Sequence, residues 1–172
     1  RGEGELTFDV EADDLLCLLD ELEIEKANFF GFSDGGNLAI VFAVNYPDRV
    51  KTLVLVGANI SPWGTKINSQ IPIITKYIKY YFEALITGDE KAALRRDIQK
   101  MMVTQPTLKF KDLEKITAPT LNIFADDDMM FEDNYVDTVC EWFEKILPKV
   151  WGKTRGPSPR QVRSYSVVLA LL

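Results

Sequence analysis

The stretch Phe30-Gly31-Phe32-Ser33-Asp34-Gly35-Gly36 decides the fold of this sequence. It places Gly-x-Ser-x-Gly between a short apolar run, Ala27–Phe32, and a longer, nearly continuous apolar segment. In a nucleophile elbow, the chain turns from strand to helix so sharply that side chains two residues before and after the serine would collide with the backbone. Gly31 and Gly35 supply the room at these two positions. The pattern therefore predicts an elbow that lifts Ser33 above the end of a strand.

The residue after the serine has a predicted role of its own. The backbone N–H of Asp34 would lie at the start of the helix and point at the oxyanion that develops during attack on a carbonyl. A Gly-x-Ser-x-Gly match also arises by chance, in roughly one chain in twenty of this length. A glycine-rich turn with a solvated serine is the plain alternative. The strand before the motif and the helix after it favour the elbow.

Strand and helix patterns alternate around this turn. An amphipathic helix is expected from Asp9 to Leu22, and buried strands are expected at Thr52–Gly57 and Pro119–Ala125. Runs that are apolar on both faces are typical of parallel strands covered by helices on both sides. The order of elements therefore predicts an α/β protein with a parallel sheet.

Residues 61–112, approximately, interrupt this alternation and are expected to form a helical insertion at the edge of the sheet. The first helix carries one apolar stripe, formed by Ile71, Ile74, Ile78, Phe82 and Leu85. Thr87-Gly88-Asp89-Glu90 matches a capping box that would open the second helix.

The composition excludes several functions. The 172 residues are 47% hydrophobic, which suits one globular domain. The 26 acidic residues against 20 basic residues argue against general binding of nucleic acid or anionic membranes. No apolar run approaches the ~18 residues that a membrane span needs. Two cysteines without CxxC spacing predict a reduced compartment, and we expect a cytoplasmic protein.

The sequence contains no histidine, which excludes a complete Ser-His-Asp triad and a histidine-ligated metal within these residues. Nothing in the sequence implies a metal site or an organic cofactor. The first residue is Arg1, and no signal-peptide pattern follows it.

Several motifs in a fixed order identify a family that this sequence resembles. They are Gly31–Asn37, Tyr46–Val50, Leu53–Asn59, Ile116–Leu121 and Ala125–Met129. Together they resemble the α/β-hydrolase superfamily, in particular small serine esterases and related hydrolases. The resemblance covers residues 1–148 and implies a parallel-sheet α/β-hydrolase fold in which the insertion forms a lid.

The resemblance also assigns roles to residues. Ser33 matches the nucleophile of an acyl hydrolase, and Asp34 matches the donor of an oxyanion-hole N–H. In Ala125-Asp126-Asp127-Asp128, the last aspartate, Asp128, matches the acid that orients the histidine. A solvated turn of three aspartates is the alternative. Trp63 in the lid is a candidate for contact with a small, apolar, ester-like substrate.

Departures from the family pattern predict an incomplete fold, with about three of the family's usual eight strands. The family's first strands would precede Arg1, and its histidine would follow the last predicted helix. Residues 149–172 carry five basic residues and no acidic residue, unlike the sequence before them. This segment is interpreted as a basic tail, or as a translated junction or out-of-frame end. A catalytically inactive fragment or a binding protein is the alternative to an enzyme, and the sequence does not predict an oligomeric state.

Overall fold

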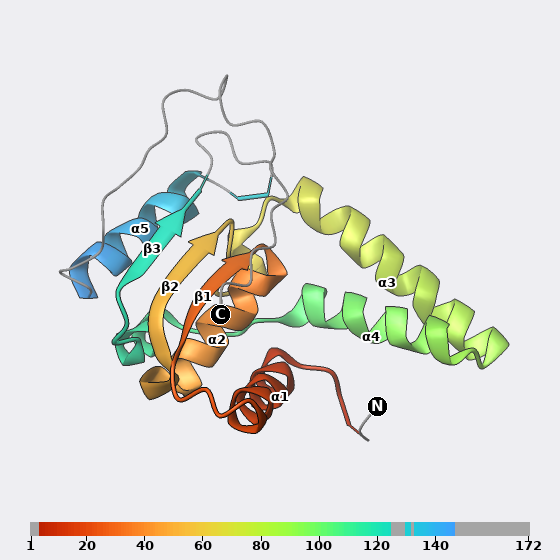
Figure 1. The fold of residues 1–172 in the computed structure, drawn as a ribbon. Coiled ribbons are helices and arrows are strands. Elements are labelled where there is room, and N and C mark those ends of the chain that lie inside the picture. Colours follow the sequence, from red (N-terminus) through yellow and green to blue (C-terminus); the bar gives the residue numbers. More distant parts are fainter. Residues whose placement is uncertain (1–3, 125–129, 132, 147–172) are drawn as a thin grey trace, which may run out of the picture.

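A computed structural model describes residues 4–124, 130–131 and 133–146. The expectations placed on Asp128 and on residues 149–172 lie outside the described residues. The helices and strands, in chain order, are α1 (Phe8–Glu21), β1 (Ala27–Phe32), α2 (Asp34–Asn45), β2 (Val50–Val56), α3 (Ile67–Thr87), α4 (Glu90–Thr104), β3 (Thr120–Ile123) and α5 (Asp133–Ile146) (Figure 1).

The three described strands form one parallel sheet in the order β1-β2-β3. Gly31 of β1 is in register with Leu55 of β2, and Leu55 is in register with Asn122 of β3. All three strands therefore end at the same edge of the sheet, where Ser33 and the loop after β2 meet. The prediction of an α/β protein with a parallel sheet is confirmed.

The core lies between the sheet and α2. Phe42 of α2 and Leu53 and Leu55 of β2 are fully buried, and the rings of Phe29 and Phe42 lie 4.8 Å apart between their centroids. Burial of this apolar surface is the main favourable contribution to folding. The near-continuous apolar sequence of α2 follows from this position, because most of its circumference is buried.

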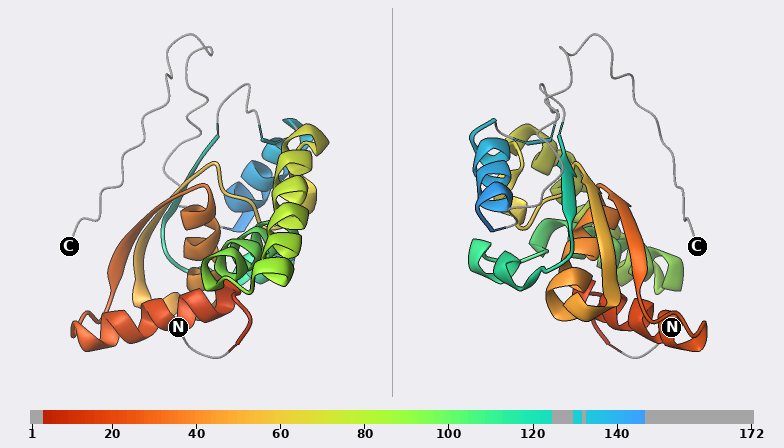
Figure 2. Two further views of the ribbon diagram at one scale, coloured as in Figure 1. Left: turned by 90° about the vertical axis from the view of Figure 1, so that its right-hand side faces the viewer. Right: turned by 60° about the vertical axis from the view of Figure 1, so that its left-hand side comes forward.

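The sheet does not have equivalent faces. Figure 2 shows the described helices on one side of the strands. On β1, Phe30 is 50% exposed and Phe32 is 59% exposed, whereas Gly31 between them is buried. The expectation of helices on both faces is therefore wrong for the described part of the chain. An apolar strand sequence indicates that both faces of the strand can be buried, but it does not specify which elements cover those faces.

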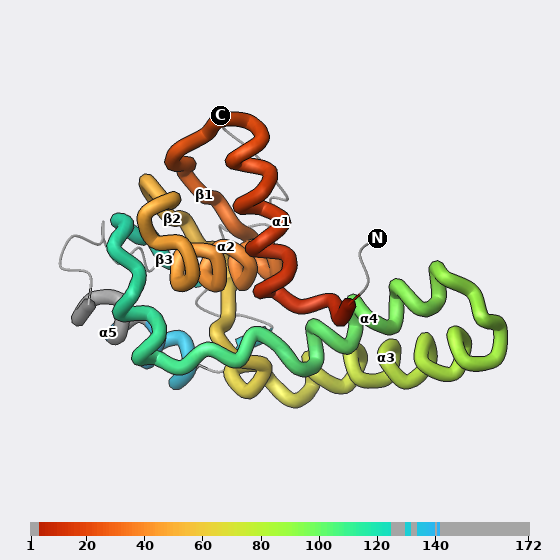
Figure 3. The backbone as a smooth tube through the Cα atoms, turned by 90° about the horizontal axis from the view of Figure 1, so that it is seen from below, coloured from red at the N-terminus to blue at the C-terminus, as the bar shows by residue number. Residues whose placement is uncertain are grey.

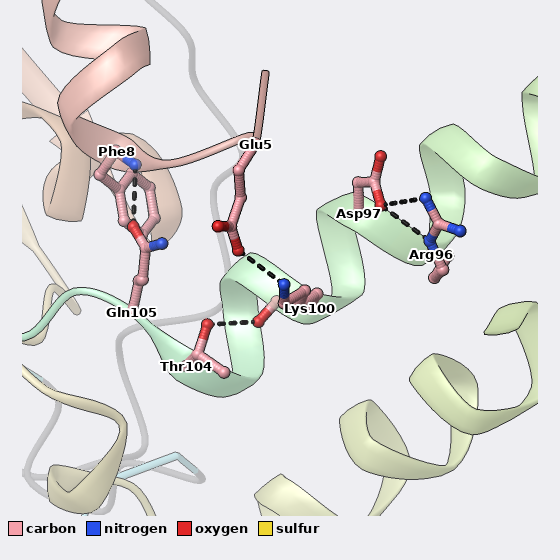
Figure 4. A network of polar contacts seen from close by, with 7 residues as sticks. All are labelled: Glu5, Phe8, Arg96, Asp97, Lys100, Thr104 and Gln105. Atoms are coloured by element: carbon pink, nitrogen blue, oxygen red, sulfur yellow. Dashed lines mark hydrogen bonds and ion pairs between the residues drawn. The ribbon is translucent and has the colours of Figure 1, made fainter.

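Helix α1 begins at Phe8, one residue before its predicted start at Asp9. The Thr7 hydroxyl accepts a hydrogen bond from the N–H of Val10 at 3.1 Å, so Thr7 caps the helix and Asp9 lies in its first turn. Polar contacts then connect this end of the chain to α4 (Figure 4). The N–H of Phe8 donates to Gln105 Oε1 at 3.0 Å, and Lys100 pairs with Glu5 at 2.6 Å.

Helices α3 and α4 pack against each other and extend away from the sheet (Figures 1 and 3). Gly88 ends α3 with a φ of 63°, a conformation that glycine adopts without strain. The Asp89 side chain then caps α4 by accepting from the N–H of Ala92 at 3.1 Å. The two predicted helices are therefore confirmed. The predicted capping box is wrong, because it would begin at Thr87, which is the last residue of α3, and the cap of α4 is Asp89. No helix of the described residues has the length and apolar character needed to cross a bilayer.

Candidate functional site

Ser33 occupies the turn between β1 and α2 in a strained backbone conformation. Its φ of 53° and ψ of −123° are rare for a residue with a side chain. The conformation is held from two sides, because the Ser33 N–H donates to the carbonyl of Val56 at 2.9 Å and its carbonyl accepts from Asn37 at 3.0 Å. The Ser33 side chain is exposed. This is the geometry that the elbow motif predicts.

The glycines around Ser33 do not contribute equally. A Cβ at Gly31 would lie 2.5 Å from the carbonyl oxygen of Gly35, so a side chain at Gly31 collides with backbone as predicted. A Cβ at Gly35 would meet nothing within 4 Å among the described residues, which differs from the expectation for that glycine. The second crowded position is Gly36, whose Cβ would lie 2.7 Å from the Cβ of Ala58. Close packing at the turn therefore requires glycine at positions 31 and 36, and not at position 35.

Asp34 is the first residue of α2 and follows Ser33 directly. Within the described residues its N–H has no hydrogen-bond acceptor, so it is available to a ligand at the helix N-terminus. The Asp34 side chain is half-buried, and burial raises the pKa of its carboxyl. The pKa of Glu11 on α1 is also raised, first by burial and then by the charge of Asp34.

Asn37 is a functional candidate that the sequence reasoning missed. It is a buried polar residue in an otherwise apolar stretch of α2. Its Oδ1 accepts from the N–H of Asn59 at 2.7 Å, and its Nδ2 faces Asp34 Oδ1 at 3.4 Å. Asn37 therefore connects the elbow to the loop after β2. A polar residue among the buried positions of a helix was the available signal, since buried polar groups need partners.

A small cavity of about 50 Å³ opens beside the elbow. The residues that line it are Ser33, Asp34, Asn37, Gly57, Asn59, Pro62, Thr65, Gln70, Ile73, Met102, Gln105, Met130 and Phe131. Elements far apart in sequence thus meet at Ser33, including α3 and α4. Trp63 is not among these residues and is 95% exposed, so the structure does not bring it to the cavity.

The cavity wall opposite the elbow joins the base of α3 to the segment after β3. The N–H of Lys66 donates to the carbonyl of Met130 at 2.6 Å, and Thr65 forms a bridge with Phe131. Tyr135 stacks on Phe131, and its hydroxyl accepts from the N–H of Ile60 at 2.8 Å. Burial raises the pKa of Tyr135 to about 12, so it stays neutral at ordinary pH.

The predicted acid lies next to this wall in sequence, since Met130 is two residues after Asp128. Asp128 itself falls outside the described residues. Among the residues that the structure describes, no group of three or more His, Cys, Asp or Glu side chains has a geometry that could hold a metal ion.

Comparison with known proteins identifies the family. The model of the alpha/beta hydrolase fold family matches residues 2–112, which is more than half of the chain. The chain therefore belongs to the α/β-hydrolase family. Its parallel sheet and its strand-turn-helix at Ser33 are the parts of that fold described above.

Individual relatives include hydrolases of several substrates. A 2-hydroxy-6-oxononadienedioate/2-hydroxy-6-oxononatrienedioate hydrolase of Burkholderia vietnamiensis is 43% identical over 134 residues, which cover 77% of this chain and 36% of the relative. A carboxylesterase structure from Nitrososphaera gargenis has a TM-score of 0.59 at 18% identity and covers 87% of this chain and 63% of that one.

A meta-cleavage product hydrolase from Pseudomonas fluorescens, solved as a mutant complexed with acetates, has a TM-score of 0.56 at 24% identity. It covers 83% of this chain and 62% of that one. At these identities the two structures show the shared fold. The matched part of this chain spans about a third of the length of the Burkholderia relative.

Proposed function

We propose that this chain carries the nucleophile of a serine hydrolase that acts on a small-molecule acyl substrate. The observation that carries the proposal is the backbone of Ser33, with a φ of 53° at a turn that Gly31 and Gly36 permit. A strained conformation persists only where the surrounding structure holds it, and such residues cluster at active sites. A solvated serine in an ordinary turn needs no such conformation.

Each step of the proposed reaction uses a group at the elbow. The Ser33 Oγ attacks the carbonyl carbon of the substrate and transfers its proton to a base, while the carbonyl oxygen becomes an oxyanion. The N–H of Asp34, at the positive end of α2, donates to that oxyanion. The leaving group departs with a proton, and water then hydrolyses the acyl-enzyme. In this proposal Asp128 orients the base, and the base is not one of these 172 residues, which contain no histidine.

The substrate class is proposed to be a carboxylic ester or a related acyl compound. The relatives support the class, because their names include a carboxylesterase and a 2-hydroxy-6-oxononadienedioate/2-hydroxy-6-oxononatrienedioate hydrolase. Cleavage of a carbon–carbon bond next to a ketone is the second candidate, favoured by the Burkholderia relative. In both cases an acyl carbonyl is attacked, so the elbow is the same.

The remaining parts of the chain have proposed roles within this scheme. Residues 1–148 form part of the hydrolase domain, and residues 61–112 form its lid, since Gln70, Ile73 and Met102 line the cavity at Ser33. Trp63 is proposed to contact substrate only if the lid moves, because it is exposed and away from the cavity. Residues 149–172 are proposed to be a basic tail.

A non-catalytic binding protein is the alternative function. The specific observation in its favour is the absence of histidine from the sequence. A protein with this elbow and without a base would bind an acyl compound at Ser33 and release it unchanged. Loss of the base costs a serine protease on the order of 10⁶-fold in kcat.

Hydrolysis of p-nitrophenyl acetate tests the two functions. The measurement uses this chain and, beside it, the longest reading frame that contains it, each with Ser33→Ala and with Ser69→Ala as a matched serine control. We expect turnover by the longer protein that Ser33→Ala abolishes and Ser69→Ala preserves. Turnover that is equal in all three proteins would remove Ser33 as the nucleophile. Binding without turnover would support the alternative.

A further inference from the structure

Helix α3 presents an apolar face that neither α4 nor the sheet covers. The large apolar side chains of this face are between 39% and 74% exposed, and they are Ile67, Ile71, Ile74, Ile78, Tyr81, Phe82 and Leu85; Ile86, beside the face, is 80% exposed. Most of this set is the stripe that the sequence shows at helical spacing. By contrast Ala84, on the side of α3 that packs on α4, is buried. Among the described residues, nothing therefore packs on the most apolar side of α3.

The stripe has a symmetric spacing. Counted from Ile78, its members lie at −7 (Ile71), −4 (Ile74), +4 (Phe82) and +7 (Leu85). Reversing the direction of the helix about Ile78 therefore superimposes the stripe on itself. An antiparallel pair of such helices, related by a twofold axis at Ile78, would place Ile71 against Leu85 of the other helix and Ile74 against Phe82. A twofold interface requires a surface that is complementary to itself in this way.

The size of the exposed face fits a stable contact. Aromatic residues have roughly 150–250 Å² of surface each. With the lower part of that range for the isoleucines and the leucine, the seven residues together expose on the order of 700 Å². This exceeds the ~300–600 Å² of the largest apolar patch on a typical monomer. Two copies meeting on this face would bury an area within the ~1,200–2,000 Å² of a specific protein–protein interface.

The charges on α3 are compatible with the antiparallel pairing. Lys76, Lys79 and Glu83 lie two, one and five residues from Ile78. At about 100° per residue, each is turned by 100° or more from Ile78 around the helix. No charged side chain of α3 is therefore placed at the centre of the proposed contact.

We propose that two copies of this chain associate through their α3 helices, packed antiparallel about Ile78. The proposal goes beyond the hydrolase function and does not depend on Ser33. It assigns the apolar stripe of α3 to a homodimer interface at the end of the molecule that extends away from the sheet (Figure 3).

Disulfide cross-linking tests the geometry. In a Cys17→Ser/Cys140→Ser background, Ile78→Cys should cross-link to itself on mild oxidation, because the twofold axis passes between the two copies of residue 78. Lys76→Cys is the control, since two residues along a helix turn the side chain by about 200°. In a mixture of two tagged chains, Ile71→Cys should cross-link with Leu85→Cys faster than either cross-links with itself. Preferred 71–71 and 85–85 products would overturn the antiparallel arrangement.

Sedimentation of the whole chain over a range of concentrations tests the association itself. We expect a monomer–dimer equilibrium whose Kd rises on the order of 100-fold in Ile78→Glu, because two carboxylates would be buried at the centre of the contact. Glu83→Gln, off the stripe, should leave the Kd unchanged. Circular dichroism checks that Ile78→Glu is folded; if it is not, the cross-linking result decides. A wild-type chain that stays monomeric, or binds phosphatidylserine vesicles as a monomer, would overturn the proposal.

Discussion

The elbow and the α3–α4 hairpin use apolar sequence in opposite ways. Around the elbow, Phe42 and Leu55 are fully buried, and a single added carbon at Gly31 would come within 2.5 Å of the backbone. On the hairpin, Leu85 and Ile86 are 70% and 80% exposed. Both regions form the secondary structure that their sequences predict. The difference lies in how much of the apolar surface of each finds a partner within the chain.

The two regions also differ in what fixes their conformation. The hairpin is specified locally, by a glycine at the end of α3 and an aspartate cap at the start of α4, and each signal acts within a few residues. The elbow has a local sequence signal as well, but it is also held by the loop after β2, where Ala58 lies against Gly36 and Asn59 binds Asn37, 22 residues away in sequence. A site that needs fixed geometry therefore lies in the second region. The first is free to present a surface.

Removing one large apolar side chain from each region should give the largest contrast. Phe42→Ala leaves a cavity in the core and is expected to lower the free energy of unfolding by about 3–5 kcal/mol. Ile86→Ala removes a side chain of similar character from the exposed surface of α3, and the expected change is within about 0.5 kcal/mol. Urea unfolding followed by circular dichroism measures both. Equal losses would show that the hairpin side chain is buried against a partner.

Alanine at the two motif glycines should sharpen the description of the elbow. Gly31→Ala forces a carbon against the carbonyl of Gly35 and is expected to cost about 1–3 kcal/mol. Gly35→Ala meets open space in a helix, so we expect no loss and a gain of up to ~1 kcal/mol from helix propensity. The comparison uses the same unfolding experiment. A larger loss at Gly35 than at Gly31 would contradict the packing described here.

A smaller, pH-dependent effect is expected at Asp34. Burial raises the pKa of its carboxyl, so the folded state binds this proton more tightly than the unfolded state does. The ionised form therefore destabilises the fold, and stability is lost as the pH rises from the ordinary carboxyl pKa through the raised one. Asp34→Asn should increase the Tm at pH 7 and give no increase below about pH 4.

The exposed carboxyl of Asp48 provides the control for this measurement. Asp48→Asn should not reproduce the change in pH dependence. Because Asp34 contributes to the raised pKa of Glu11, the pKa of Glu11 should fall in Asp34→Asn, which NMR titration can follow. A Tm gain of the same size at every pH would show that burial of the Asp34 charge is not its cause.

The fold and the elbow could be predicted because their signals are local. The glycine spacing about Ser33 and the apolar runs of β1 and β2 identify a strand-turn-helix in a parallel sheet without any knowledge of what packs on it. The helices of the hairpin were predicted for the same reason. The roles of Ser33 and Asp34 in catalysis stay predictions that the proposed assay can test.

The details that sequence reasoning did not reach depend on neighbours in space. Gly36 is crowded because Ala58 lies above it, and Gly35 is not crowded, although Gly35 is the glycine of the motif. Trp63 was predicted to contact substrate and is exposed, while Gln70 and Phe131 line the cavity. Asn37 became a candidate only through its hydrogen bond with the N–H of Asn59, 22 residues away in sequence.

The sequence by itself determined which residues form strands and helices, where the chain turns at Ser33, and that an apolar stripe runs along α3. These properties follow from backbone conformational preferences and side-chain periodicity, which act over a few residues. Only the tertiary structure decided which face of the sheet is covered, which glycine is crowded, and which side of α3 remains exposed. Those outcomes depend on packing between distant segments, and periodicity identifies an apolar face without identifying its partner.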